Sequence, residues 1–395
     1  MVVLAVLAGA VLSAACRTVD PVGDECRGIE SSPYGWYESD HSRRWIIPAG
    51  AGHPAAVALD EKTFVVFDQR SERIWTGSKG HSIEIVEATC EGVRRFRLHG
   101  DEGTALYRRI ERGYRTSEVE LRSGDVLLRG LLLKSENPRA GVVFIHGAGT
   151  SDRDNVWYLT LAEHLANNGI DVLLPDKRGS GRSGGDWRRA TFEVLATDAI
   201  DAVERLGDEP DARRPIGVLG ISQGGWVVPI AASRSERVDF AISMVGAVVP
   251  LAEQQKHLLS TTASAMGLTA DSRESLARLA GLAERYLRSG SGWDEYQEQR
   301  RRLAEGPLAP LVAAFPADRE DWQWSWGRPI FDFDPLPLWS ALEVPALAVF
   351  GEDDPNVPTR VSVERLRRDA PQVEVLSLPG RGHGLQTPEG TLDPR

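Results

Sequence analysis

Residues 215–225 read P-I-G-V-L-G-I-S-Q-G-G, and this stretch decides the fold of the larger part of the chain. An apolar run ends in a glycine-rich turn that carries Ser222, and a helical pattern starts directly after it. A serine with glycines two residues to either side, between a strand and a helix, is typical of a nucleophile held in a strained turn. The sequence therefore predicts that the Ser222 hydroxyl is exposed at the head of a helix, where amide groups favour developing negative charge.

Five more short apolar runs have the composition of strands that are buried on both faces of a sheet. They cover residues 141–145, 170–174, 240–245, 346–350 and 373–378. Helical patterns over residues 155–168 and 192–206 follow the first two of these runs, and such an alternation predicts βαβ units. Upstream, runs over 117–121 and 126–133 flank a Ser-Gly-Asp turn, as in a β-hairpin. The predicted fold class is α/β, with a doubly wound and mostly parallel sheet.

A histidine and a carboxylate follow the last two predicted strands. A serine hydroxyl is a weak nucleophile near neutral pH, so it needs a base that a carboxylate orients. His383 lies in a glycine-rich loop after the last strand and is the candidate base. The loop after the preceding strand offers Asp353 and Asp354, with Glu352 less well placed. Adjacent aspartates point in different directions, so only one of the two can orient the imidazole.

Acyl transfer also needs amide donors aimed at the developing oxyanion. The N–H of Gln223, directly after the serine, is the first candidate. The second is expected in the turn after the first buried strand, which reads H-G-A-G-T at 146–150. Its small residues let a substrate approach the backbone, and we place the donor at Ala148 rather than Gly147. His146 is expected to be structural and not a second base.

These motifs resemble those of the α/β-hydrolase superfamily, and the resemblance extends from about residue 116 to the end of the printed sequence. The motifs that carry it are H-G-A-G at 146–149, D-K-R-G-S-G-R-S at 176–183, G-I-S-Q-G at 220–224, G-E-D-D-P-N-V-P at 351–358 and G-H-G at 382–384. Within the superfamily the chain is similar to bacterial secreted esterases and to the serine-aminopeptidase-like and dienelactone-hydrolase-like branches.

The resemblance implies a role for each candidate residue. In these relatives the aspartate stands three residues after the glycine that ends the strand, which implies Asp354 here. The implied catalytic residues are then Ser222, Asp354 and His383, with the amides of Ala148 and Gln223 as the oxyanion hole. Segment 176–183 resembles a structural loop near the active site, and no catalytic part is assigned to it.

Residues 251–339 interrupt the alternation of strands and helices, and we expect a helical cap over the carboxyl ends of the strands. A helix start is predicted at Asp271, because Glu274 follows at the spacing of a capping box. Gly290 is predicted to end this helix. The hydrolase domain with this cap is expected to cover residues 116–395.

Trp322, Trp324 and Trp326 alternate within the predicted cap. Side chains with this spacing share one face only if the segment is extended. An aromatic wall for an apolar substrate group is one interpretation. We favour the other, in which these rings join the cap to the sheet.

The first residues of the chain differ in composition from the rest, because they form one apolar segment. Residues 2–15 are apolar or small, and at roughly 15 residues this run is shorter than the about 20 of a membrane span. We interpret residues 1–16 as an export signal, because 12–16 read L-S-A-A-C and resemble a bacterial lipoprotein signal with a lipid anchor at Cys16. The expected location is periplasmic or cell-surface; an uncleaved anchor or a misassigned start are the alternatives.

Residues 27–115 are expected to form a small β-rich domain, because short apolar runs alternate there with Gly, Asp and Ser clusters. Cys26 and Cys90 either pair or remain two free thiols. The net charge of −11 excludes nucleic acid as an expected partner. No Cys or His spacing fits zinc and no phosphate-cradling loop is present in the sequence, so no metal or cofactor is expected.

The predicted function is that of a serine hydrolase, a carboxylesterase that cleaves a small-molecule ester through an acyl-serine intermediate. A serine peptidase or aminopeptidase is the first alternative, and acids such as Glu253 or Asp294 would then have to hold the free amine. A non-catalytic binding lipoprotein on the same scaffold is the second alternative.

Overall fold

The computed structural model describes residues 35–40, 43–47, 55–58, 64–71, 73–77, 80–89, 92–101, 103–110, 113–209 and 214–385. The predicted export signal, the lipid site at Cys16 and the cysteines Cys26 and Cys90 lie outside these ranges. Within them, no helix combines the length and the apolar character that crossing a membrane requires. The chain divides into two compact units, one with the residues from Tyr114 to Leu385 and one within the residues from Ala10 to Gly113.

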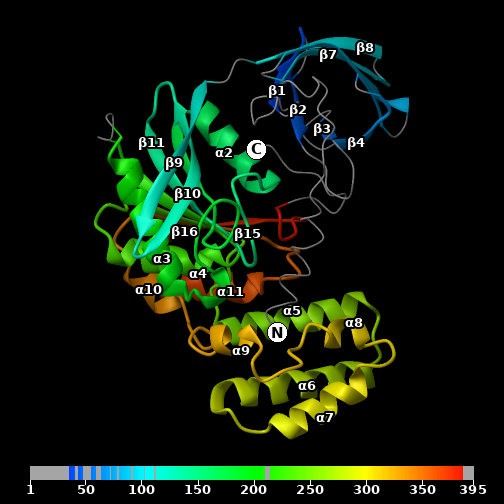
Figure 1. The fold of residues 1–395 in the computed structure, drawn as a ribbon, viewed down its shortest axis with the longest axis vertical. Helices are drawn as coiled ribbons and strands as arrows, with labels where there is room; N and C mark the ends of the chain where they lie inside the picture. Colours follow the sequence, from blue (N-terminus) through cyan, green and yellow to red (C-terminus); the bar gives the residue numbers. More distant parts are fainter. Residues whose placement is uncertain are drawn as a thin grey trace. The chain divides into compact units, whose positions relative to one another are not determined.

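The first unit along the chain is a closed barrel of antiparallel strands, each paired with the next and β1 paired with β8 (Figure 1). The strands are β1 (Gly35–Glu38), β2 (Arg43–Ile47), β3 (Ala55–Ala58), β4 (Phe64–Gln69), β5 (Ile74–Gly77), β6 (Ser82–Thr89), β7 (Gly92–Gly100) and β8 (Gly103–Arg109). Large rings fill its interior, among them Phe67, Trp75 and Phe96. An eight-stranded barrel is narrow enough for side chains to pack its centre in this way.

The second unit is built on one mixed sheet with the order β16-β15-β14-β13-β11-β12-β10-β9. The strands are β9 (Tyr114–Ser123), β10 (Val126–Ser135), β11 (Ala140–Ile145), β12 (Ile170–Pro175), β13 (Ile216–Ile221), β14 (Phe240–Met244), β15 (Ala346–Gly351) and β16 (Val373–Leu378). β9 and β10 form the predicted hairpin. The six strands from β11 to β16 all run parallel to one another.

Helices cover both faces of this sheet, because alternate side chains of each buried strand point to opposite faces. They are α2 (Val156–Asn167), α3 (Phe192–Gly207), α4 (Gly224–Arg234), α10 (Leu336–Ala341) and α11 (Thr359–Asp369). Strand β11 illustrates the pattern: Val142 belongs to the apolar cluster that includes α2, whereas Val143 belongs to the cluster of α3 and α4. The prediction of a doubly wound, mostly parallel α/β sheet is confirmed.

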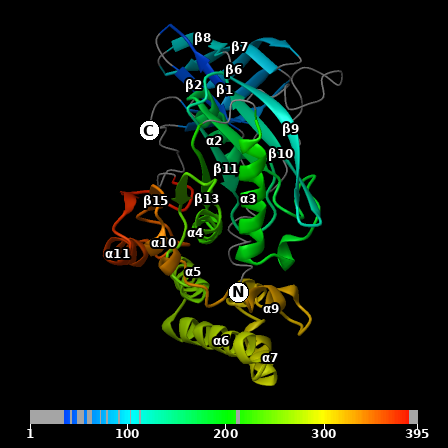
Figure 2. The same ribbon diagram turned by 90° about the vertical axis from the view of Figure 1, so that its left-hand side faces the viewer.

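A helical insertion follows β14, as predicted. It contains α5 (Leu251–Ala265), α6 (Ala270–Ser289), α7 (Trp293–Leu303), α8 (Ala309–Val312) and α9 (Trp322–Gly327). In both views α5 and α9 lie between the sheet and the pair α6–α7 (Figure 1 and Figure 2). The predicted start of α6 at Asp271 is wrong, because Thr269 caps the helix by accepting a hydrogen bond from the Ser272 N–H at 3.2 Å. Gly290 ends it as predicted, with φ of 69°.

The three alternating tryptophans lie on a helix and not on an extended segment. On α9, Trp322 and Trp326 are one turn apart, and their ring centroids are 6.1 Å from each other. The Trp326 indole donates to the carbonyl of Ala190 in the sheet domain at 2.9 Å. Trp324 lies on the other face, and its ring packs 4.9 Å from that of Tyr286 in the cap. The Trp322 ring packs 5.0 Å from that of Trp187 in the sheet domain. Two of the rings therefore join the cap to the sheet domain, and the third stabilises the cap itself.

Candidate active site

Ser222 occupies a strained turn between β13 and α4. Its φ is 55°, a left-handed conformation that is uncommon for any residue except glycine. The Ser222 N–H donates to the carbonyl of Met244 on the next strand at 2.9 Å, and the Ser222 carbonyl accepts from the Gly225 N–H at 2.9 Å. These bonds hold the unfavourable conformation at the carboxyl end of the central strand.

The glycines around Ser222 are required by close backbone contacts. A Cβ at Gly220 would lie 2.4 Å from the carbonyl oxygen of Gly224. A Cβ at Gly224 would lie 2.4 Å from the carbonyl oxygen of Ile145, the last residue of β11. The turn is therefore pressed against the neighbouring strand, which explains why the sequence carries glycine two residues to either side of the serine.

Gly224→Ala is expected to lower the free energy of unfolding by about 3 kcal/mol, because the added methyl group meets backbone that cannot move aside. Urea-induced unfolding followed by far-ultraviolet circular dichroism measures the change. The matched control is Gly281→Ala on α6, where an added Cβ meets no atom within 4 Å. There alanine is expected to stabilise the helix by about 0.5 kcal/mol. Equal unfolding midpoints for the two variants would contradict this explanation of the turn.

The structure brings Ser222, His383 and Asp354 into one hydrogen-bonded chain. His383 Nε2 lies 3.0 Å from Ser222 Oγ, and His383 Nδ1 lies 2.8 Å from Asp354 Oδ2. An ionised carboxylate only accepts hydrogen bonds, so Nδ1 carries the proton and Nε2 is left to accept from the serine hydroxyl. This arrangement is the one in which an imidazole takes a proton from a serine nucleophile.

Of the three acids in the loop after β15, only Asp354 contacts the histidine. It is 6% exposed, and its other oxygen, Oδ1, accepts from the N–H groups of Asn356 at 2.7 Å and Val357 at 3.1 Å. Asp353 and Glu352 are exposed, and Glu352 accepts from Ser377 Oγ at 3.0 Å. The geometry thus agrees with Asp354, which the family resemblance implied.

Ala148 and Gln223 line the same cavity as Ser222, and its volume is about 30 Å³. Among the described residues, neither the Ala148 N–H nor the Gln223 N–H has a hydrogen-bond partner. The Gly147 N–H, by contrast, donates to the Tyr158 hydroxyl at 2.7 Å. Two amides without a described partner therefore belong to residues that line the cavity beside the serine, and Ala148 is a better candidate donor than Gly147.

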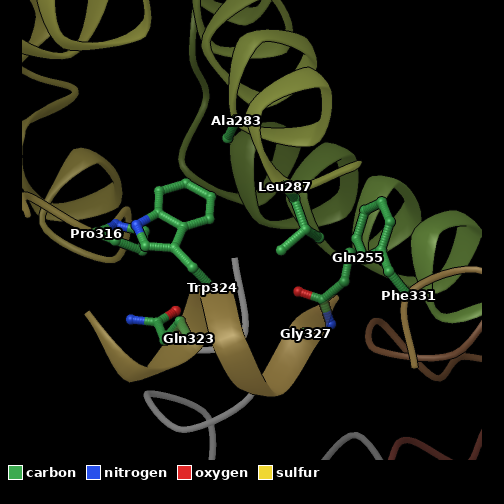
Figure 3. Close-up of a pocket in the computed structure, with 8 residues that line it drawn as sticks. All are labelled: Gln255, Ala283, Leu287, Pro316, Gln323, Trp324, Gly327 and Phe331. Atoms are coloured by element: carbon green, nitrogen blue, oxygen red, sulfur yellow. The ribbon is translucent and has the colours of Figure 1, made fainter. Parts of the chain in front are cut away.

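A second cavity, of about 20 Å³, lies inside the cap between α5, α6 and α9 (Figure 3). Trp324 from α9 and Leu287 from α6 are among the side chains that enclose it, and Gln255 from α5 borders both cavities. Gln255 donates to Gln254, which in turn donates to the carbonyl of Asn356 at 2.7 Å. The cap is thereby tied to the loop that carries Asp354.

The described hydrogen bond of the His146 side chain is to the backbone and not to Ser222. Burial lowers the pKa of His146 to about 4, so the ring is neutral near pH 7. Its Nε2 lies 2.5 Å from the carbonyl oxygen of Pro175, to which it donates. The prediction of a structural histidine agrees with these contacts.

Lys177 is a residue of this site that the sequence reasoning missed, because it lies in the segment that was assigned no catalytic part. Its Nζ donates to the carbonyl of Gly147 and to the side-chain oxygen of Gln223, both at 2.7 Å. The only available signal was its position two residues after the end of β12, at the sheet edge where the candidate residues gather. In the part of the chain that the structure describes, no group of His, Cys, Asp and Glu could hold a metal ion.

The mainly parallel sheet and the serine turn at its centre define the α/β-hydrolase fold. A sequence model of the Alpha/beta hydrolase family matches residues 142–393, so the chain belongs to this family. A solved structure of an alpha/beta hydrolase from a Penicillium species shares 20% sequence identity, with a TM-score of 0.46 over 68% of this chain and 91% of the other.

Curated relatives match parts of the chain. A protein of Mycobacterium tuberculosis named as a candidate phosphoribosyl transferase is 32% identical over 167 residues, which are 39% of this chain and 38% of the relative. The chain thus spans less than half of the length of that relative. A non-heme haloperoxidase of Rhodococcus erythropolis is 25% identical over 62% of this chain and 86% of its own length.

Proposed function

We propose that this protein is a serine hydrolase that cleaves carboxylic esters of small molecules. The observation that carries the proposal is the hydrogen-bonded chain from Ser222 through His383 to Asp354. Membership of the alpha/beta hydrolase family supports it. The free amides of Ala148 and Gln223 beside the serine supply the remaining requirement, a pair of donors for the oxyanion.

In the proposed reaction, Ser222 Oγ attacks the ester carbonyl carbon while its proton passes to His383 Nε2. Asp354 holds the imidazole in the tautomer that accepts this proton and stabilises the imidazolium. The amides of Ala148 and Gln223 donate to the oxyanion. Collapse of the tetrahedral intermediate breaks the bond to the alcohol oxygen, which takes the proton from His383. Water then attacks the acyl carbon and gives a proton to His383. Collapse breaks the bond between that carbon and Ser222 Oγ, which takes the proton back from His383 as the acid leaves.

The cavity favours a neutral ester over the free amine of an aminopeptidase substrate. An ammonium group that is partly buried in this cavity gains from a carboxylate partner, because burial of an unpaired charge is costly. The residues that line the cavity beside Ser222 include no Asp or Glu. The two acids considered for this role, Glu253 and Asp294, are exposed and do not border it.

The cavity beside Ser222 is small, about 30 Å³, and this also favours short acyl groups. We therefore expect kcat/KM for the p-nitrophenyl esters of acetate and butyrate to exceed that for laurate by about 10-fold or more.

The same enzyme is expected to form one adduct with a fluorophosphonate probe. An absent adduct would favour the binding lipoprotein, and cleavage of an aminoacyl p-nitroanilide at a rate similar to that of the esters would favour the peptidase.

A further inference from the structure

The ammonium group of Lys177 lies between the two candidate oxyanion donors. Lys177 is 6% exposed, and its Nζ reaches Gly147 on the β11 turn and Gln223 on the serine turn, at 2.7 Å each. The Nζ also lies 5.6 Å from the ring centroid of Trp187, over its face. Among the described residues Lys177 forms no ion pair, so its charge is balanced by these neutral groups at short range.

The bond to Gly147 acts on the first donor directly. The Gly147 carbonyl and the Ala148 N–H belong to the same peptide group, so a cation held against the oxygen fixes the direction of the N–H. It also polarises the peptide and strengthens the N–H as a donor. A Cβ at Gly147 would lie 3.4 Å from Ser222 Cβ, which places this turn directly beside the nucleophile. Glycine is conformationally permissive, so the turn depends on such contacts for its geometry.

The bond to Gln223 acts on the second donor. The Gln223 backbone N–H is the candidate donor on the serine turn, and its buried side chain accepts from Lys177. One ammonium group therefore connects the two segments whose amides have to converge on the same oxygen atom. A buried charge at this position also attracts the developing oxyanion more strongly than an exposed charge would.

We propose that Lys177 is a positioning residue, which holds the amides of Ala148 and Gln223 in the geometry of an oxyanion hole and stabilises the oxyanion through its charge. This proposal rests on the proposed esterase function. It adds a fourth side chain, from the loop after β12, to those of the serine, the histidine and the aspartate.

The charge of Lys177 is expected to depend on pH within the working range of the enzyme. Burial lowers the pKa of Lys177 to about 7, and Asp198 on α3 opposes the shift. Other charged or titratable groups nearby include His146, Asp176, Tyr158 and Arg178, and Arg178 is paired with Asp198. The ammonium form is present below this pKa and is lost as the pH rises through it. The wild-type kcat is therefore expected to fall as the pH rises through about 7.

Lys177→Met is the decisive variant, because methionine keeps most of the length of the side chain and removes the charge and both hydrogen bonds. We expect kcat for p-nitrophenyl acetate to fall by about 10- to 100-fold, with KM changed by less than about 3-fold. Affinity for a boronic acid, which forms a tetrahedral anion on the serine, is expected to fall in parallel with kcat. The alkaline decrease of kcat is expected to be absent from this variant.

Arg178→Met is the matched control, because it removes the neighbouring half-buried cation, which pairs with Asp198 and makes no described contact with either donor. Its kcat is expected to stay within about 3-fold of wild type. Lys177→Met with unchanged kcat and boronate affinity, or an equal loss in Arg178→Met, would overturn the proposal. If Lys177→Met does not fold, Gln223→Leu keeps the backbone N–H of residue 223 and removes the side-chain oxygen that accepts from Lys177. Its kcat is expected to fall by about 10-fold, and an unchanged kcat overturns the proposal. Failure of the wild-type enzyme to cleave any ester would instead refute the proposed function.

Discussion

Ser222→Ala is expected to lower kcat/KM for p-nitrophenyl acetate by about 10⁴- to 10⁶-fold. The size of the loss follows from the hydrogen bond between Ser222 Oγ and His383 Nε2, because without the hydroxyl there is no nucleophile for the base to activate. The residual rate above that in water comes from the amide donors and from substrate binding. Steady-state assays with purified enzyme measure the loss of kcat/KM. Intact-mass spectrometry is expected to show no fluorophosphonate adduct.

Ser264→Ala is the control for this variant, because Ser264 is an exposed serine on α5 in the cap. It is expected to keep both the wild-type rate and the adduct. Alanine fits the φ of 55° at position 222 no worse than serine does, so the melting temperature of Ser222→Ala should be close to that of wild type. An adduct that persists in Ser222→Ala would place the nucleophile elsewhere and refute the proposed mechanism.

Asp354→Asn is expected to lower kcat by about 10⁴-fold while the fold is retained. Oδ1 of Asp354 accepts hydrogen bonds from the N–H groups of Asn356 and Val357, and the oxygen of an asparagine can accept the same two bonds. Its NH₂ group then faces His383 Nδ1 and favours the tautomer with the proton on Nε2. In that tautomer the imidazole cannot accept the proton of Ser222. Steady-state kinetics together with near-ultraviolet circular dichroism separate this loss from unfolding.

Asp353→Asn is the matched control, since the two aspartates are adjacent in sequence and only Asp354 is buried against the histidine. Its kcat is expected to stay within about 2-fold of wild type. A larger loss in Asp353→Asn than in Asp354→Asn would mean that the loop adopts another arrangement during catalysis, and the assignment of Asp354 would be wrong.

The strands and the serine turn of the hydrolase unit could be predicted because their signals are local. Short apolar runs predicted strands β11 to β16 to within about one residue at most ends. The glycines at 220 and 224 predicted the strained turn at Ser222, and the close contacts at both positions supply the reason. Asp353 and Asp354 could not be separated by residue type or spacing alone. The family pattern implied Asp354, and the hydrogen bond to His383 agrees with it.

Other features could not be predicted, either because more than one local pattern fits the same residues or because contacts distant in sequence decide them. Trp322 and Trp326 share a face only because the segment is helical, and alternation by itself could not distinguish a helix from a strand there. Helix α6 begins after Thr269, whose hydroxyl caps it, and not at the predicted capping box of Asp271 and Glu274. A lysine such as Lys177 is usually exposed, and its burial depends on which strands happen to be neighbours.

By itself, the sequence determined the α/β class, the strand-to-helix turn at Ser222 and the loop that carries His383, because periodicity and glycine spacing report on backbone that is close along the chain. Only the tertiary structure decided which side chains meet at the serine. β11 lies between β13 and β12 in the sheet, so the turns after these three strands end side by side although long stretches of chain separate them. This order brings Ala148, Lys177 and Gln223 together, and it follows from the pairing of whole strands rather than from any local pattern.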